Sequence, residues 1–130
     1  MRVVGPIYSG AAAGGAGVAT ANATTTNVVA GLVHAVYLQY LDSPPAGTCD
    51  VTVATAGVAH PAVTILAITN AATDGWFLPR AATHSTAGAA ALYAAAGTAG
   101  NDLLPIADLV KVTIAQANAG DGVNVWLLVK

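Results

Sequence analysis

The sequence predicts an all-β fold, a small antiparallel β-sandwich or jelly roll with an extended N-terminal arm. In several segments apolar residues alternate with polar or small ones, which is the period of a strand that buries one face. Short segments rich in Gly, Asn, Asp and Pro separate these runs and are typical of turns. The 130 residues are enough for one domain. We therefore expect an arm over residues 1–27 and a β-sandwich domain over residues 28–130.

The N-terminal residues predict a short strand followed by a segment that cannot build a core. Residues 2–7 favour a strand, and Pro6 would place it at a sheet edge. Residues 9–21 are mostly Ala and Gly, a composition that is flexible in isolation. This segment is either a flexible linker or an arm that becomes ordered along a neighbouring subunit. In the second interpretation its anchors are Val3, Val4, Ile7 and Tyr8.

Residues 28–55 predict two strands joined by a sharp turn. Residues 28–41 alternate and are rich in β-branched and aromatic side chains, which favours a strand; a helix is the alternative. One face of this strand would hold Leu32, His34, Val36, Leu38 and Tyr40. Residues 42–47 break the chain with two prolines and a glycine. Residues 48–55 alternate again, so we expect a hairpin in which Cys49 is a buried, inert thiol.

The middle of the chain predicts shorter strands. Residues 63–69 are an almost continuous apolar run, which indicates a central strand covered on both faces. Residues 76–80 follow a turn and predict a short aromatic strand that ends at Pro79. Residues 81–100 are rich in Ala and predict either a helical turn or a short strand between loops. The next residues predict a turn that leads into a short edge strand.

The C-terminal segment has the clearest pattern. Two alternating runs, residues 110–115 and 123–129, flank the turn sequence of residues 118–122, and together they predict an antiparallel hairpin. In the second run Trp126 and Leu128 lie opposite an apolar row, so both faces of that strand should be covered. We expect another sheet on one face, and an arm or a partner subunit on the other.

The composition predicts self-association and argues against nucleic acid and membrane partners. Hydrophobic residues make up 55% of the chain and charged residues 8%, with a net charge of −2. Copies therefore repel one another weakly, and exposed apolar area favours contact; the alternative is that Ala, Thr and Gly cover the surface without a partner. The four basic residues form no stripe of the kind that binds nucleic acid. The longest apolar run, residues 28–41, is interrupted and shorter than the roughly 20 residues of a spanning helix.

The sequence lacks the motifs of enzymes, cofactor sites and metal sites, so we expect a protein without catalytic activity. His34, His60 and His84 do not have the spacing of metal ligands. Residues 14–17 are Gly-rich but lack the Lys-Ser/Thr ending of a phosphate loop. The single cysteine excludes a disulfide within the chain. The first residues lack the pattern of a secretion signal, which indicates a protein made in a cytoplasm.

Candidate interface residues are concentrated in residues 74–80. Trp76, Phe77 and Arg80 belong to the residue types that dominate the energetics of interfaces. Neighbours in a strand point to opposite faces. One of Trp76 and Phe77 should therefore belong to the core, and the other should face a partner or a covering loop. Together with Trp126 and the four N-terminal anchors, these residues form the predicted interface with other subunits.

Two segments resemble the capsid decoration, or cement, proteins of tailed bacteriophages, which are encoded beside the major capsid protein. They are residues 69–80, TNAATDGWFLPR, and residues 112–128, VTIAQANAGDGVNVWLL. The likeness lies in the C-terminal half of the chain and is looser over residues 28–55. The resemblance implies a homotrimer that binds the major capsid protein on the outer surface of the phage head and stabilises the head by bridging capsomers. It also implies a location on the capsid exterior of the virion, after synthesis in the host cytoplasm.

The alternative function is a carbohydrate- or receptor-binding β-sandwich module of a phage tail tip or fibre. An exposed Trp76 or Tyr93 in a groove would favour this alternative. A hydrolase or a metalloenzyme is a third and more distant possibility.

Overall fold

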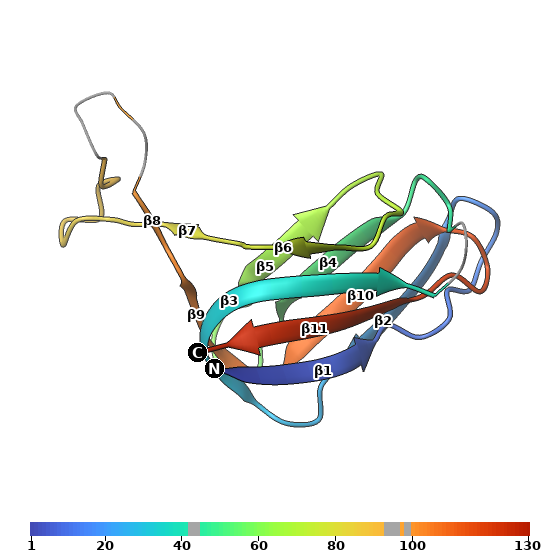
Figure 1. Cartoon of the computed structure of the whole chain (residues 1–130), viewed down its shortest axis with the longest axis horizontal. Helices are drawn as coiled ribbons and strands as arrows, with labels where there is room; N and C mark the ends of the chain where they lie inside the picture. Colours follow the sequence, from blue (N-terminus) through green and yellow to red (C-terminus); the bar gives the residue numbers. More distant parts are fainter. Residues whose placement is uncertain (42–44, 93–96, 98–99) are drawn as a thin grey trace.

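The computed structural model describes residues 1–41, 45–92, 97 and 100–130, and these residues form an all-β fold (Figure 1). The predicted fold class is confirmed, and residues 29–40 form a strand rather than the alternative helix. Within the described ranges, no helix has the length and apolar character needed to cross a membrane. The strands are β1 Arg2–Tyr8, β2 Ala19–Thr24, β3 Val29–Tyr40, β4 Asp50–Thr55, β5 Thr64–Ile68, β6 Gly75–Phe77, β7 Ala81–Ala82, β8 Asn101–Asp102, β9 Leu104–Asp108, β10 Val110–Ala117 and β11 Val123–Val129.

Two antiparallel sheets form the layers of a sandwich (Figure 1). The first sheet has the order β1-β11-β3-β6, and β9 also pairs with β3. The second sheet has the order β2-β10-β4-β5. The long strand β3 uses residues 29–33 to pair with β9 and residues 36–38 to pair with β6. The two halves of one edge of β3 are thus covered by two different short strands.

The inward rows of both sheets form one core of small and medium-sized apolar side chains. In β11 every second residue is buried, in the predicted phase. The same alternation holds in β10 over residues 110–114 and in β4. The largest fully buried side chains come from both sheets: Val33, Val36, Leu38, Val51, Val53, Val110, Val112, Ile114, Val123, Val125, Leu127 and Val129. Since removing these groups from water is the main favourable term in folding, this shared core is what holds the two layers together.

Both predicted hairpins are wrong, although their strands are correct. β10 lies in the second sheet and β11 in the first, and β3 and β4 are divided between the sheets in the same way. Both connections therefore cross from one layer to the other. Alternation fixes which side chains of a strand point inward. Two inward rows can then lie side by side in one sheet or face each other across the core, and the pattern is the same in both cases.

The buried carboxylate of Asp121 joins the two crossing connections. Its Oδ2 accepts hydrogen bonds from the backbone N–H of Asn118 at 2.9 Å and of Ala46 at 3.0 Å. Asn118 belongs to the β10–β11 connection and Ala46 to the β3–β4 connection. Bonds from backbone donors to an ionised carboxylate are about twice as strong as neutral ones, so Asp121 fixes both crossings at this end of the sandwich.

Cys49 is a buried free thiol beside this carboxylate, and its predicted burial is confirmed. Its Sγ lies 3.8 Å from Oδ2 of Asp121. Burial, and then the negative charge of Asp121, raise the pKa of the Cys49 thiol to about 11. The thiol is therefore protonated at neutral pH, which is the unreactive form.

Residues 1–27, expected to form an arm, contribute one strand to each of the two sheets. β1 pairs with β11 and β2 pairs with β10, which makes them the edge strands of the two sheets. Between these strands Ser9 and Ala12 are buried. Ser9 donates its N–H to the carbonyl of Val123 at 3.0 Å, and its Oγ accepts the N–H of Val123 at 3.0 Å. The small side chains, which suggested flexibility, instead let the backbone approach the sandwich closely.

Two further strands differ from the prediction. In β3 the inward face changes at His34, because Val33 and Ala35 pair with consecutive residues of β11 and leave His34 as the extra residue of a bulge. Leu32, expected on the same face as Val36 and Leu38, consequently lies on the opposite one and is 39% exposed. β5 lies at the edge of the second sheet, whereas a central strand was expected. The prediction failed because an apolar run does not reveal whether a strand has one neighbour or two.

A hairpin projects from the end of the sandwich at which the two chain termini lie (Figure 1). It connects β6 with β9, and β7 and β8 pair at its base, with Ala81 opposite Asp102. A bridge between His84 and Ala90 continues the structure outward. The alternative of a short strand is thus correct for the first residues of the predicted segment 81–100, whereas its residues 93–96 and 98–99 lie outside the described residues.

A second buried carboxylate, Asp108 at the end of β9, holds the loop between β4 and β5. Its Oδ2 accepts the N–H groups of Gly57 at 3.0 Å and Val58 at 2.9 Å, and its Oδ1 accepts the N–H of Leu109 at 2.7 Å. Burial alone would raise the pKa of Asp108. The backbone donors outweigh this effect and hold the pKa below its ordinary value of 3.8.

Asp108 should make the fold sensitive to acid. Because its pKa is lower in the folded than in the unfolded chain, the ionised group stabilises the fold above the unfolded pKa, and this contribution is lost as the pH falls through the folded pKa. In urea unfolding measured from neutral to acid pH, Asp108→Asn should lower the midpoint at neutral pH and flatten its fall in acid. The control is Asp102→Asn, a change at an exposed residue of the projecting hairpin. Equal acid dependence of the parent and Asp108→Asn would contradict this role.

Candidate interaction surface

The outer face of the first sheet carries a row of three aromatic side chains. Trp126 in β11 is opposite Tyr37 in β3, and Tyr37 is opposite Trp76 in β6. The ring centroids of Trp126 and Tyr37 are 5.8 Å apart, and those of Tyr37 and Trp76 are 4.9 Å apart. These are the distances of attractive aromatic pairs. Each residue is the direct cross-strand neighbour of the next, so the register of three strands builds the row.

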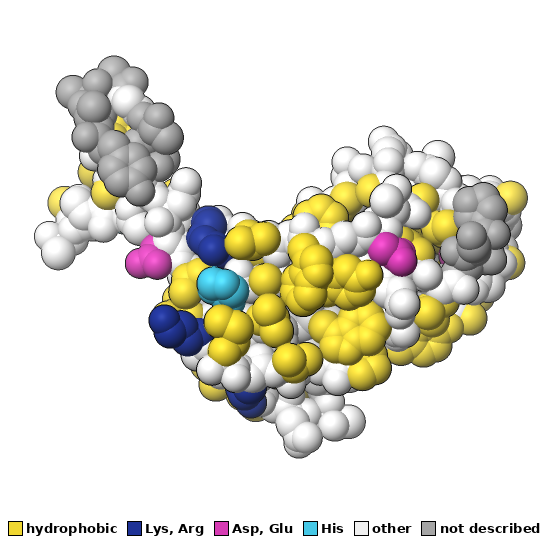
Figure 2. Space-filling model, in the orientation of Figure 1, with side chains coloured by type: hydrophobic (Ala, Val, Ile, Leu, Met, Phe, Trp, Pro, Cys, Tyr) yellow, Lys and Arg dark blue, Asp and Glu magenta, His cyan; other side chains and the backbone are white. Residues whose placement is uncertain are grey.

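Two aliphatic side chains complete this surface. Val3 in β1 is opposite Leu128 in β11, on the same outer face as Trp126. The five side chains line a shallow hollow of about 240 Å³. Figure 2 shows a continuous group of hydrophobic side chains here, over β3 and β11. We call this surface the apolar face; its residues are Val3, Tyr37, Trp76, Trp126 and Leu128.

Much of the apolar face is open to solvent. Trp76 is 56% exposed and Val3 is 64% exposed. Tyr37, Trp126 and Leu128 are half-buried. Scattered exposed apolar residues are normal on protein surfaces, but a contiguous group of large ones marks a contact site.

A glycine in β1 lets Trp126 lie close to the neighbouring strand. Gly5 has φ +135°, a backbone conformation that favours glycine. A Cβ at this position would lie 2.6 Å from the carbonyl oxygen of Val125 and 3.1 Å from Cδ1 of Trp126. Position 5 therefore has no room for a side chain, and the indole occupies the space that one would take.

Basic side chains lie at one end of the apolar face. Arg2 donates from Nη2 to the carbonyl of Ala30 at 2.7 Å, and Arg80 donates from Nη1 to the carbonyl of His34 at 3.1 Å. The backbone of Lys130 is hydrogen bonded to Leu32 in both directions. Three of the four basic residues of the chain thus contact the first half of β3, and Figure 2 shows basic side chains beside the hydrophobic surface. We call Arg2, Arg80 and Lys130 the basic rim.

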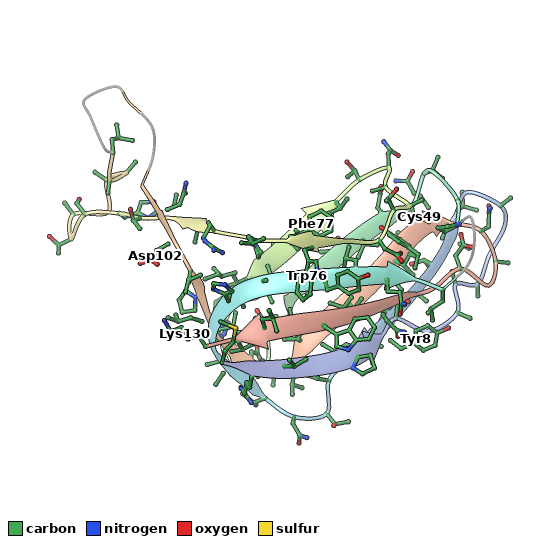
Figure 3. All side chains as sticks on the ribbon, viewed as in Figure 1. Tyr8, Cys49, Trp76, Phe77, Asp102 and Lys130 are labelled. Atoms are coloured by element: carbon green, nitrogen blue, oxygen red, sulfur yellow. The ribbon has the colours of Figure 1, made fainter. Side chains whose placement is uncertain are left out.

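The predicted interface residues fall into three groups. Val3, Trp76 and Trp126 meet in the apolar face, and Arg80 lies in the basic rim. Val4, Ile7 and Phe77 pack in or against the core instead, because they occupy the inward positions of β1 and β6. Tyr8 is 44% exposed at the far end of β1, away from Lys130 (Figure 3), and its ring lies against Gly122. The question left open by the sequence is thus answered: Phe77 packs against the core, and Trp76 faces outward.

Sequence reasoning missed Tyr37 and Gly5 as parts of this surface. The alternation of residues 28–41 separates Tyr37 from the face of Leu38, but the sequence does not reveal which aromatic residues lie beside Tyr37 in the neighbouring strands. Gly5 had no signal in the sequence, since its role follows from the β1–β11 register.

The described residues offer little for chemistry elsewhere. Among them, no group of three or more His, Cys, Asp or Glu side chains is placed to hold a metal ion. A wider groove of about 510 Å³ lies between residues 2–8 and 23–29, where the edge strands of the two sheets leave the sandwich open. It is lined by residues of β1, among them Val4, Pro6 and Tyr8, and by the segment of residues 23–29, which is rich in Thr.

The adjacent aromatic residues Trp76 and Phe77 should differ sharply in their effect on stability. Trp76→Ala removes an exposed ring and one aromatic pair, and should cost about 1 kcal/mol. Phe77→Ala leaves a gap against the core and should cost at least about 2 kcal/mol. Urea unfolding followed by circular dichroism measures both. Equal costs, or a larger cost for Trp76→Ala, would mean that the apolar face serves the fold and not a partner.

No family model, curated protein or solved structure matches this chain. What the molecule does is therefore inferred from the surface itself. Its most distinctive feature is an aromatic and aliphatic face with a basic rim, which suits contact with another protein surface.

Proposed function

We propose that this chain is a structural virion protein, a capsid decoration or cement protein. In this function, homotrimers bind the major capsid protein on the outer surface of a phage head and stabilise the head by bridging capsomers. The observation on which the proposal rests is the apolar face, a contiguous and solvent-exposed group of large side chains. In the proposed assembly, a partner surface covers the apolar face.

The residue types of the apolar face support a protein partner. Trp and Tyr are enriched among the residues that contribute most to binding energy, and Arg is the third such type. Here two Trp and one Tyr lie side by side, and Arg80 and Arg2 border them. Aromatic rings offer large contact areas at a low cost in side-chain entropy, so this face is suited to forming a tight contact.

The low charge of the chain supports repeated assembly. A net charge of −2 over 130 residues gives little repulsion between neighbouring copies. A trimer that touches a shell at several linked points needs only modest affinity at each point, because the later contacts form within one complex. Small uncharged surfaces repeated over a shell can therefore give strong retention.

The resemblance to decoration proteins supports the same function. Its two segments, residues 69–80 and 112–128, contain Trp76 in the first, and Trp126 and Leu128 in the second. Trp76 and Trp126 lie on either side of Tyr37. The two segments thus contribute three of the five residues of the apolar face, while Val3 and Tyr37 come from other parts of the chain. On this proposal the protein is made in the host cytoplasm and ends on the capsid exterior of the virion.

The alternative is a carbohydrate- or receptor-binding module of a tail tip or fibre. The exposure of Trp76 favours it, because aromatic rings can stack on sugars; Tyr93 lies outside the described residues. One feature favours the decoration protein: neighbouring rings are tilted by 43° and 46° and form no flat platform for a sugar to stack on. Binding on a glycan array, abolished by Trp76→Ala, would support the module instead.

Retention on phage heads tests the proposed function. Expanded heads lacking this protein are mixed with the parent chain, with Trp76→Lys, or with the control Val18→Lys, which changes a 70% exposed residue outside the apolar face. Trp76→Lys should reduce retention at least about tenfold, because a charge replaces a central aromatic contact, while the control should bind as the parent does. Parent protein should also raise the temperature at which heads rupture.

The result that would contradict the proposal is a folded parent chain that neither binds heads nor protects them. Binding that survives Trp76→Lys undiminished would separate head binding from the apolar face and remove the observation on which the proposal rests.

A further inference from the structure

The described residues of the projecting hairpin, residues 78–92 and 100–103, extend away from the sandwich (Figure 1). None of its described residues between 81 and 92, or between 100 and 103, is buried. Its backbone bonds are internal, such as Thr83 N–H to the carbonyl of Gly100 at 2.9 Å and Ser85 N–H to the carbonyl of Ala89 at 2.8 Å. A two-stranded hairpin without a packed face is at best marginally stable in water, so its order requires a surface to lie on.

The surface of the hairpin is uncharged and small. From Ala81 to Asn101 the sequence contains no Asp, Glu, Lys or Arg. Leu78 at its base is 58% exposed and Leu92 is 44% exposed. Solvated hairpins usually carry charges that keep them soluble and apart. The absence of charge here is suited to burial against an apolar partner.

The hairpin and the apolar face cannot meet within one molecule. The hairpin extends past the end of the sandwich (Figures 1 and 2), while the apolar face lies over the middle of the first sheet. Each is uncovered, each is apolar, and each is presented away from the other. A second copy of the chain could supply an apolar face for the hairpin and a hairpin for the apolar face.

The charges of the hairpin do not oppose this pairing. Its charged residues are Arg80 and Asp102, both at its base, so the base carries no net charge. The part of the hairpin beyond this base would therefore meet a neighbour's apolar face without burying a charged side chain.

We propose that the projecting hairpin of one copy docks on the apolar face of the next copy. The proposal rests on the proposed function, for which it specifies how the homotrimer is held together. The contact joins two different surfaces, so each copy gives one hairpin and receives one. Contacts of this head-to-tail kind close into a ring when the rotation between copies fits, and a trimer is the ring expected here.

Two variants and their mixture test this arrangement. The face variant, Val3→Asp with Trp76→Lys, keeps the hairpin intact. The hairpin variant, Ala87→Asp with Leu92→Lys, keeps the face intact. Both change only exposed residues and leave the net charge at its parent value, and Val18→Lys is the control. Circular dichroism and urea unfolding check that each variant is folded, and light scattering after size exclusion gives the mass.

The parent and the control should be trimers, and each variant alone should be a monomer. The mixture of the two variants should form a one-to-one dimer, because the intact hairpin of one fits the intact face of the other while no further copy can be added. A monomeric parent, a variant that remains trimeric, or a mixture that stays monomeric would overturn the inference. A monomeric parent that is retained on heads would overturn the trimer and leave head decoration standing, whereas a trimer that ignores heads would overturn head decoration alone.

Discussion

The register of β3 with its neighbours is the constraint on which the rest of the account depends. β3 pairs with β11 on one side and with β6 and β9 on the other. This pairing fills the core with the inward rows and, on the outer face, aligns Trp126, Tyr37 and Trp76 in consecutive strands. A shift of one residue in either pairing would exchange the two faces of a strand. The core and the apolar face therefore depend on the same strand register.

The sequence was sufficient for the fold class and for most inward-facing residues, because alternation reports the two faces of a strand directly. It was not sufficient for strand partners. The turn at residues 118–122 has the composition of a hairpin turn, yet the chain crosses the sandwich there, held by Asp121 and with Gln116 at φ 50°. Small residues before residue 22 suggested flexibility, but their small size is what lets Ser9 and Ala12 pack under the edge strands.

The interaction surface was only partly predictable, because the sequence does not reveal which strands are neighbours. Trp76 and Trp126 stand out by residue type, but nothing local shows that Tyr37 lies between them. The inward residues Val4, Ile7 and Phe77 could not be separated from outward ones before the strand faces were known. The projecting hairpin was the hardest element to foresee, because an alanine-rich, charge-free segment is equally typical of a helix. Like the arm that was expected at the N-terminus, this hairpin extends away from the domain, but it lies between β6 and β9.

The central claim is that the apolar face is open in the single chain and covered in the assembled particle. Both tryptophans of the chain lie in this face, so they report on it directly. The most direct measurement is hydroxyl-radical footprinting read by mass spectrometry, on the protein bound to heads and on the same protein diluted until it is monomeric. The account predicts rapid oxidation of Trp76 in the monomer and strong protection on heads. Equal oxidation of Trp76 in both states would contradict it.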